Sequence, residues 1–219
     1  MNTLPDAKDI FFINPYDTKG GASMGTFRLF SYFRKYISAK ASLRVIVKNS
    51  SESIGVYGLP SLFRVIFYLQ ALFNKLLCRL SSIGSLPVAV TFFVPFSLPA
   101  LVLFFNSRRA FSVYLHSMGS GFSCPSSFSL LISSASVVKT ADDWYLTGGC
   151  HYSLECNQWR YGCKSCPLMN PFGKVIVRLN WLLKRIVLSR SSRFVFVSPS
   201  KWLSSRYEYL YPGRCSVIY

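Results

Sequence analysis

Acidic residues are scarce in this chain: eight Asp and Glu stand against 25 Lys and Arg in 219 residues, which gives a formal net charge of +17. No Asp-rich calcium loop, HExxH motif or motif for a nucleophilic Ser or Cys is present. The excess of positive charge predicts attraction to phosphate, in nucleic acid or at an anionic membrane, with an indifferent basic surface as the alternative. The aromatic content of 16% favours the membrane.

The sequence also predicts no secretory leader. The first residues, "MNTLPDAKDIFFIN", carry acids where a signal peptide has a basic region, and their apolar run is too short. We therefore expect a cytoplasmic protein, in which cysteines are reduced and clustered thiols indicate metal more than disulfide. The hydrophobic content of 51% predicts an ordered domain with a real core.

One uncharged run has the length of a membrane span. It reads "LPVAVTFFVPFSLPALVLFF" over Leu86 to Phe105. Pro87, Pro95 and Pro99 would interrupt a single helix, so a buried strand, a turn and a short helix are favoured over a transmembrane segment. The helix expected over Ser61 to Leu80 has few polar interruptions, which predicts a helix that is widely buried or lies on lipid.

The remaining periodicity predicts an α/β fold with a Rossmann-like parallel sheet flanked by helices. A strand over Asp9 to Asn14, a glycine loop, a helix with Ser23 as its N-cap and a strand over Leu43 to Lys48 form a βαβ unit. Further strands are expected over 111–116, 135–140 and 193–200, and further helices over 173–189 and 200–211, the last capped by Ser198 or Ser200. We expect one domain over residues 1–219.

Polar residues follow several of the expected strands. Gly20 and Gly21 precede a helix N-terminus, where backbone amides can approach an anion, although a purely structural turn fits equally well. His116 and the pair Asp142 and Asp143 also stand at strand ends, where open α/β sheets bind ligands. The alternatives are a structural histidine and a solvated turn.

Four cysteines lie within seventeen residues, at Cys150, Cys156, Cys163 and Cys166. Closely spaced thiols with one CxxC arm can supply the four soft ligands of a structural zinc ion, and His151 could replace one of them. Reduced core thiols and a disulfide pair are the alternatives. Four sulfur ligands would leave no open position for catalysis, so such a zinc would be structural.

The longest specific motif, "ADDWYLTGGCHYSLECNQWRYGCKSCP", resembles the family 4 glycosyltransferases of bacterial O-antigen, colanic acid and capsule assembly. The segments "INPYDTKGGAS", "YLHSMG" and "FVFVSPSKWLSS" are similar to the family's first strand and glycine loop, its next strand end and the close of its N-terminal domain. The final "CSVIY" resembles the strand that leads into a second domain. The resemblance covers nearly the whole chain, with a cysteine-rich insertion at about residues 147–170.

The resemblance implies the N-terminal half of a two-domain GT-B fold. A nucleotide-sugar donor would be held mainly by a C-terminal domain, expected beyond Tyr219 or on a separate polypeptide, and transfer would retain configuration without a metal cofactor. Gly20, Gly21 and Ala22 would approach the donor phosphates, and His116 would line the acceptor side. Asp142 would lie beside the reaction centre as the candidate catalytic residue, with Trp144 in the substrate site.

One departure concerns the reaction centre: the family's strand-end histidine aligns with Ala141, and only Asp142 matches. The chain therefore resembles a truncated, inactive enzyme or one part of a split one. Its implied acceptor is a polyprenyl-diphosphate-linked glycan at the inner face of the cytoplasmic membrane, with no nucleic acid as partner. Residues 173–219, with nine Lys or Arg and one acid, Glu208, would dock on anionic lipid.

Two other classes of protein compete with this interpretation. One is a zinc-containing basic module that binds nucleic acid, and the other is a small integral membrane protein built around residues 86–105. The βαβ order with a glycine loop after the first strand favours the glycosyltransferase, because neither alternative requires that order.

Overall fold

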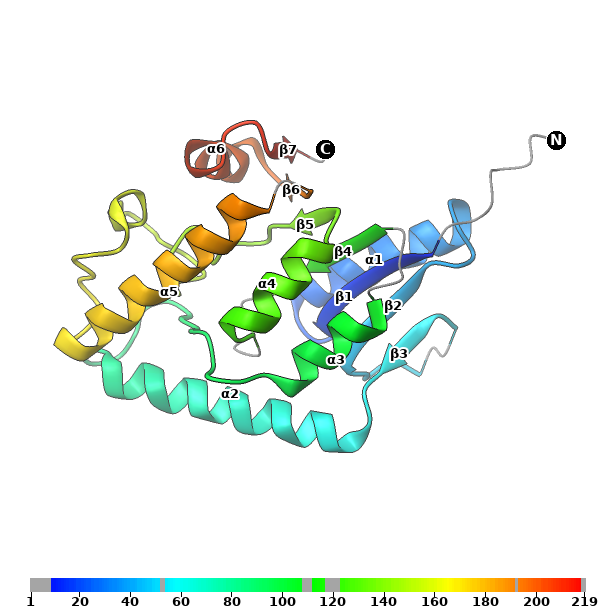
Figure 1. Ribbon diagram of the computed structural model, residues 1–219, viewed down its shortest axis with the longest axis horizontal. Helices are drawn as coiled ribbons and strands as arrows, with labels where there is room; N and C mark the ends of the chain where they lie inside the picture. The colour runs from blue at the N-terminus through cyan, green and yellow to red at the C-terminus, as the bar shows by residue number, and fades with distance from the viewer. Residues whose placement is uncertain (1–8, 52–53, 108–111, 117–122, 192, 218–219) are drawn as a thin grey trace.

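The computed structural model describes residues 9–51, 54–107, 112–116, 123–191 and 193–217. In these residues a seven-stranded sheet has the order β3-β2-β1-β4-β5-β6-β7, and every neighbouring pair is parallel (Figure 1). The strands are β1 (Ile10–Tyr16), β2 (Ser42–Val47), β3 (Val56–Gly58), β4 (Ser112–His116), β5 (Val137–Lys139), β6 (Val195–Ser198) and β7 (Cys215–Val217). The predicted α/β fold with a Rossmann-like parallel sheet is confirmed.

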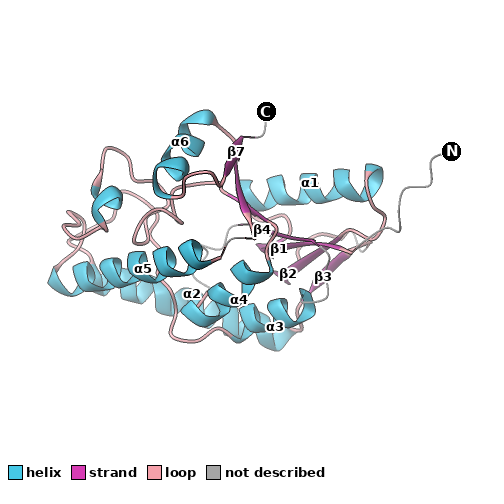
Figure 2. Ribbon diagram, turned by 45° about the horizontal axis from the view of Figure 1, so that its top comes forward, coloured by secondary structure: helices cyan, strands magenta, loops and turns pink. Residues whose placement is uncertain are grey.

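Helices cover both faces of the sheet. They are α1 (Gly21–Tyr36), α2 (Ser61–Ser81), α3 (Leu98–Ser107), α4 (Pro125–Ser134), α5 (Pro171–Arg190) and α6 (Lys201–Leu210), with a 3₁₀ turn over Gln158–Tyr161. Figure 2 shows α1 on one side of the sheet and α2 to α5 on the other. The helix α6 packs through Tyr207 and Leu210 into the same core cluster as α2 to α5. Both layers bury apolar strand residues, which accounts for the near-continuous apolar runs in the sequence.

The start of the first helix differs from the prediction. Gly20, not Ser23, is the N-cap of α1, and it makes no side-chain cap bond. Ser23 instead lies in the first turn, where its Oγ accepts a 2.9 Å hydrogen bond from Asn14 Nδ2. The strand β1 continues through Pro15 to Tyr16, although the sequence predicted its end at Asn14. Beyond Ile13 it pairs only with β2, so no partner on the β4 side needs the N–H that proline lacks.

Two elements have no counterpart in the sequence-based expectations. The edge strand β3 is three residues long, too short to show an alternating pattern. The helix α4 is rich in serine, and its amphipathic pattern is weak, but Phe128, Leu131 and Ile132 pack it into the core. Pro125 opens this helix at a position where a missing N–H costs nothing.

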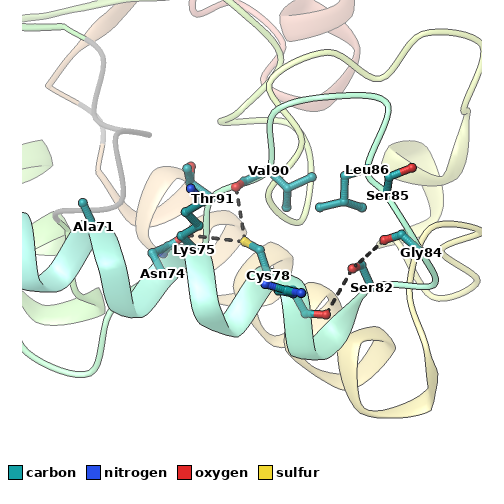
Figure 3. Close-up of a pocket in the computed structure, with 11 residues that line it drawn as sticks. Ala71, Asn74, Lys75, Cys78, Ser82, Gly84, Ser85, Leu86, Val90 and Thr91 are labelled. Atoms are coloured by element: carbon teal, nitrogen blue, oxygen red, sulfur yellow. Dashed lines mark hydrogen bonds between the residues drawn. The ribbon is translucent and has the colours of Figure 1, made fainter.

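The uncharged run 86–105 is not a transmembrane helix in this structure, which corrects the integral membrane interpretation built on it. Only its last part is helical, in α3, and residues 89–94 form an extended segment between helices and the cysteine-rich loop. Asn74 Nδ2 donates to Phe92 O at 2.6 Å, and Asn180 Oδ1 accepts from Phe93 N at 2.7 Å. Figure 3 shows Cys78 Sγ directed at Val90 O, at 3.3 Å. Side chains therefore supply several of the hydrogen-bond partners of this backbone, and Gly149 O, His151 N and Ser123 O supply others.

Among the described residues, one helix is long and apolar enough to cross a membrane, and it is α2. Only 17% of its most apolar 18-residue window is buried. The expectation of a helix buried on a wide face is therefore wrong for α2.

Candidate functional site at the carboxyl edge of the sheet

A cavity of about 270 Å³ opens at the carboxyl ends of the strands. It lies where the strand order reverses, between β1 and β4, which is the usual ligand position in open α/β sheets. Its lining comes from the start of α1, from the ends of β4 and β5 and from the residue after β6: Gly21, Ala22, Gly25, His116, Lys139, Thr140, Ala141 and Pro199. The structure thus brings together three predicted residues, Gly21, Ala22 and His116.

His116 is held in one tautomer at this cavity. Its Nδ1 lies 2.8 Å from Thr26 Oγ1, and the single hydroxyl proton of Thr26 is donated to Ala22 O at 2.9 Å. Nδ1 must therefore carry the ring proton and donate it to Thr26. Nε2 is left with a lone pair, and it has no hydrogen-bond partner among the described residues.

Burial and the nearby charge of Lys139 lower the pKa of His116 to about 3. The imidazole is therefore neutral at any physiological pH and accepts hydrogen bonds through Nε2. A general base works best with a pKa near the operating pH, and this one is far below it. His116 is suited to orienting a ligand hydroxyl rather than to taking up its proton.

Lys139 is a site residue that the sequence analysis did not single out. The parallel register pairs it with His116, so both side chains project from the same face of the sheet. Desolvation lowers the pKa of its side-chain amine, which lies at the cavity. The sequence held a signal for this residue, because Lys139 is the one charged residue in the predicted strand over 135–140.

The glycine loop leaves the start of α1 accessible. Gly20 has a φ of 83°, which favours glycine, and a Cβ added at Gly20 or Gly21 would meet no described atom within 4 Å. A Cβ at Gly25 would lie 3.3 Å from Lys139 Nζ. The unpaired amides of the helix start and the Lys139 ammonium therefore face one space, a combination that suits an anionic oxygen.

Ala141 lines the cavity at the position of the family's strand-end histidine. Asp142, the next residue, does not line it. One oxygen of its carboxylate accepts from Trp144 N at 2.9 Å, and the other accepts from His151 Nδ1 at 2.6 Å. Both oxygens are thus engaged in holding the cysteine-rich loop to the end of β5.

Trp144 is not brought to the cavity either. It is 1% exposed, it packs against Phe93 and Phe128, and its Nε1 donates to Thr91 O at 3.0 Å. Lys184 Nζ lies 3.9 Å from the centre of its ring and donates to Trp144 O at 2.6 Å. Burial lowers the pKa of Lys184 to about 7. The environment of Trp144 is that of a core residue.

Asp143 joins the strand end, the cysteine-rich loop and α6. Its Oδ2 accepts from Ser153 N at 3.0 Å and from Ser153 Oγ at 2.9 Å. Its Oδ1 lies 3.1 Å from Arg206 Nε without hydrogen-bond alignment, so this contact is an ion pair. The two adjacent aspartates therefore fasten the loop and do not form a solvated turn.

All four clustered cysteines line a second, mostly apolar cavity of about 530 Å³. Among the described residues, no three His, Cys, Asp or Glu side chains are placed to share a metal ion. The zinc site expected from the spacing of Cys150, Cys156, Cys163 and Cys166 is not formed here and stays a prediction. All seven cysteines lie in the described ranges and are free thiols. Burial raises the pKa of Cys150 to about 12 and that of Cys163 to about 11, so both are protonated near neutral pH.

Comparison with known proteins gives a partial match. No family model matches the sequence. A protein of Escherichia coli (strain K12), named as the colanic acid biosynthesis glycosyl transferase WcaC, is 35% identical over 85 residues, which are 35% of this chain and 20% of the relative. The matched segment thus spans a fifth of the relative's length. Together with the all-parallel sheet, this match supports a relationship of the chain to family 4 glycosyltransferases.

Proposed function

We propose that the chain forms the acceptor-side domain of a glycosyltransferase that transfers a sugar from a nucleotide-sugar donor to a polyprenyl-diphosphate-linked glycan. The reaction would belong to cell-surface polysaccharide assembly at the inner face of the cytoplasmic membrane. The observation that carries the proposal is the cavity at the β1 and β4 ends, where a neutral histidine acceptor, a lysine and a helix N-terminus converge. The partial match to WcaC supports the same class of activity.

The groups around the cavity fit a ligand that carries both hydroxyls and phosphate. A sugar hydroxyl can donate to His116 Nε2, which otherwise stays buried without a partner. A phosphate oxygen can accept from the first amides of α1 and from the Lys139 ammonium. The phosphate could come from the donor nucleotide or from the lipid diphosphate of the acceptor, and both share this chemistry.

The chemical step itself would need groups beyond the cavity lining. His116 has too low a pKa to act as a base, and the Asp142 carboxylate is bonded to Trp144 and His151. We therefore assign this domain binding and orientation of the acceptor. Most of the donor contacts would come from a second domain, as in the resembling family.

The test is isothermal titration calorimetry with two groups of ligands: a short prenyl-diphosphate-linked saccharide, and UDP-, GDP- and TDP-sugars. Loss of one ligand hydrogen bond, in His116→Gln, is expected to weaken saccharide binding about tenfold. Lys139→Met is expected to weaken it similarly and to reduce its dependence on salt.

The control variant is Lys35→Met, which removes an exposed cation of α1 that does not line the cavity. It is expected to leave binding unchanged. Binding of nucleotide sugars but not of the saccharide would assign the cavity to the donor. No binding of either ligand would overturn the proposal.

A further inference from the structure

The outer face of α2 carries a continuous apolar stripe. Its members recur at intervals of three and four residues and fall within an arc of about 100° on the helix. They are 44% to 64% exposed: Leu62, Val65, Leu69, Leu72, Phe73, Leu76 and Leu80. We call this set the α2 stripe. Patches of this kind on a folded surface mark an interaction site.

The α2 stripe is not the face that holds the helix to the protein. Phe67, Asn74, Cys78 and Ser81 are the buried residues of α2, and the helical spacing places them on the opposite side. They pack against β2, α3, α5 and the extended segment. The helix is therefore apolar on two sides, and only one of them has a partner among the described residues.

Three cations border the α2 stripe along one side. Arg64, Lys75 and Arg79 are exposed, and the helix contains no Asp or Glu. Lys75 and Arg79 also line an open groove of about 740 Å³ between α2 and residues 82–91, whose floor includes Cys78, Leu86 and Val90. Figure 3 shows Lys75 and Cys78 projecting from α2 toward the extended segment that carries Val90.

We propose that α2 binds the surface of an anionic membrane, with the α2 stripe at the boundary of headgroups and acyl chains. The helix would lie in the plane of the interface over about 30 Å, the length of 21 helical residues. Arg64, Lys75 and Arg79 would extend their charged ends to lipid phosphates beside it. A second copy of the chain would bring no acidic side chain of α2 to meet these cations, so charge complementarity selects lipid.

The α2 surface differs from the one expected from the sequence to dock on anionic lipid, residues 173–219. Residues 173–219 contain nine Lys and Arg, and four of these side chains contact other groups of the fold. Lys184 donates to Trp144 O, Arg185 to Leu210 O, and Arg214 to Leu188 O, while Arg206 pairs with Asp143. Four of the nine cations thus have structural roles, and docking of this segment on lipid stays a prediction.

Flotation of the full chain with vesicles tests the proposal without reference to catalysis. Vesicles of phosphatidylcholine alone are compared with an equimolar mixture of phosphatidylcholine and phosphatidylglycerol. The protein is expected to float with the mixture. Leu72→Ser/Leu76→Ser is expected to weaken binding at least tenfold, because two side chains no longer enter the apolar layer. Arg64→Gln/Lys75→Gln/Arg79→Gln is expected to weaken it on the order of a hundredfold.

Each variant has a matched control on α1, on the other face of the sheet, or in the turn that follows α1, where Lys40 lies. Tyr32→Ser/Tyr36→Ser removes two apolar side chains of similar exposure, and Arg28→Gln/Lys35→Gln/Lys40→Gln removes the same net charge. Both are expected to bind vesicles as the wild type does.

Three results would overturn the proposal: no flotation with anionic vesicles, equal losses in the α1 and α2 variants, or a dimer in sedimentation that Leu72→Ser/Leu76→Ser converts to a monomer. A failure of saccharide binding would leave the vesicle result unaffected, so the two proposals can fail separately.

Discussion

His116 shows how one side chain defines the chemistry of the candidate site. Thr26 fixes the proton on Nδ1, and Nε2 is left buried without a hydrogen-bond partner among the described residues. His116 itself lines the cavity. A buried acceptor without a partner costs stability, so its retention at a sheet edge is better explained by a ligand than by folding. His116 can therefore accept a hydrogen bond from a ligand hydroxyl, but its pKa is too low for it to take the proton away.

The low pKa of His116 predicts sensitivity to acid. The group titrates near pH 6.5 in the unfolded chain and near pH 3 in the folded one. Between these values the unfolded state binds a proton that the folded state excludes, so stability falls as pH falls, by about 1.4 kcal/mol per pH unit for one such group. Urea unfolding of wild type and His116→Gln at pH 7 and pH 5 measures this.

The wild type is expected to lose more stability than His116→Gln between the two pH values, by about 2 kcal/mol. Equal losses would show that His116 is protonated in the folded protein, and the tautomer argument would then be wrong.

Ala141 is the residue at which the chain departs from the resembling family. It is exposed and lines the cavity, so Ala141→His should fold with unchanged stability. The new imidazole can add one hydrogen bond to a bound saccharide, which is expected to tighten binding several-fold. Calorimetry on Ala141→His checks this, with Ala141→Leu as a control for bulk. A loss of binding in the histidine variant alone would place the saccharide elsewhere.

Among the elements, the segment 89–94 owes part of its backbone hydrogen bonding to side chains and the rest to backbone bonds with Gly149, His151 and Ser123. Asn74 both donates to Phe92 O and accepts from Phe92 N, and Asn180 accepts from Phe93 N. These groups are buried, so removing the amide leaves backbone atoms unpaired.

Asn74→Ala is therefore expected to lower the free energy of unfolding by about 2–3 kcal/mol. Asn157→Ala, at an exposed asparagine in the cysteine-rich loop, is the control and should change it little. Chemical denaturation measures both. Equal values for the two variants would contradict the anchoring role of Asn74.

Elements with a local signal could be predicted from the sequence. The βαβ order, the glycine loop, the helix over 61–80 and the Ser200 cap of α6 follow from periodicity and capping residues, and the structure confirms them. The path of residues 86–97 could not be predicted, because it depends on Asn74, Asn180 and Gly149, which are distant in sequence.

The candidate site divides in the same way. The strand-end positions of His116 and the glycine loop were predicted from the chain alone, and they meet at one cavity. Lys139 was missed because its importance comes from the β4 to β5 register, which no local pattern encodes. Asp142 and Trp144 were placed in the site by resemblance, whereas their partners His151 and Lys184 give them structural environments.

At the scale of the whole molecule, the parallel sheet separates two surfaces. The cavity lies at the carboxyl edge of the sheet, at the start of α1. The α2 stripe is exposed on the outer side of the helix layer that covers the other face of the sheet. A glycan carried on a lipid diphosphate would need both a polar cavity and contact with the membrane. The two proposals are therefore compatible, although each rests on its own residues.

The most direct measurement is calorimetric titration of the full chain with a short prenyl-diphosphate-linked saccharide. The account predicts saturable binding that weakens about tenfold in His116→Gln and in Lys139→Met and is unchanged in Lys35→Met. Saccharide binding of equal strength in all four proteins, or none in the wild type, would contradict the assignment of the cavity to a glycan acceptor.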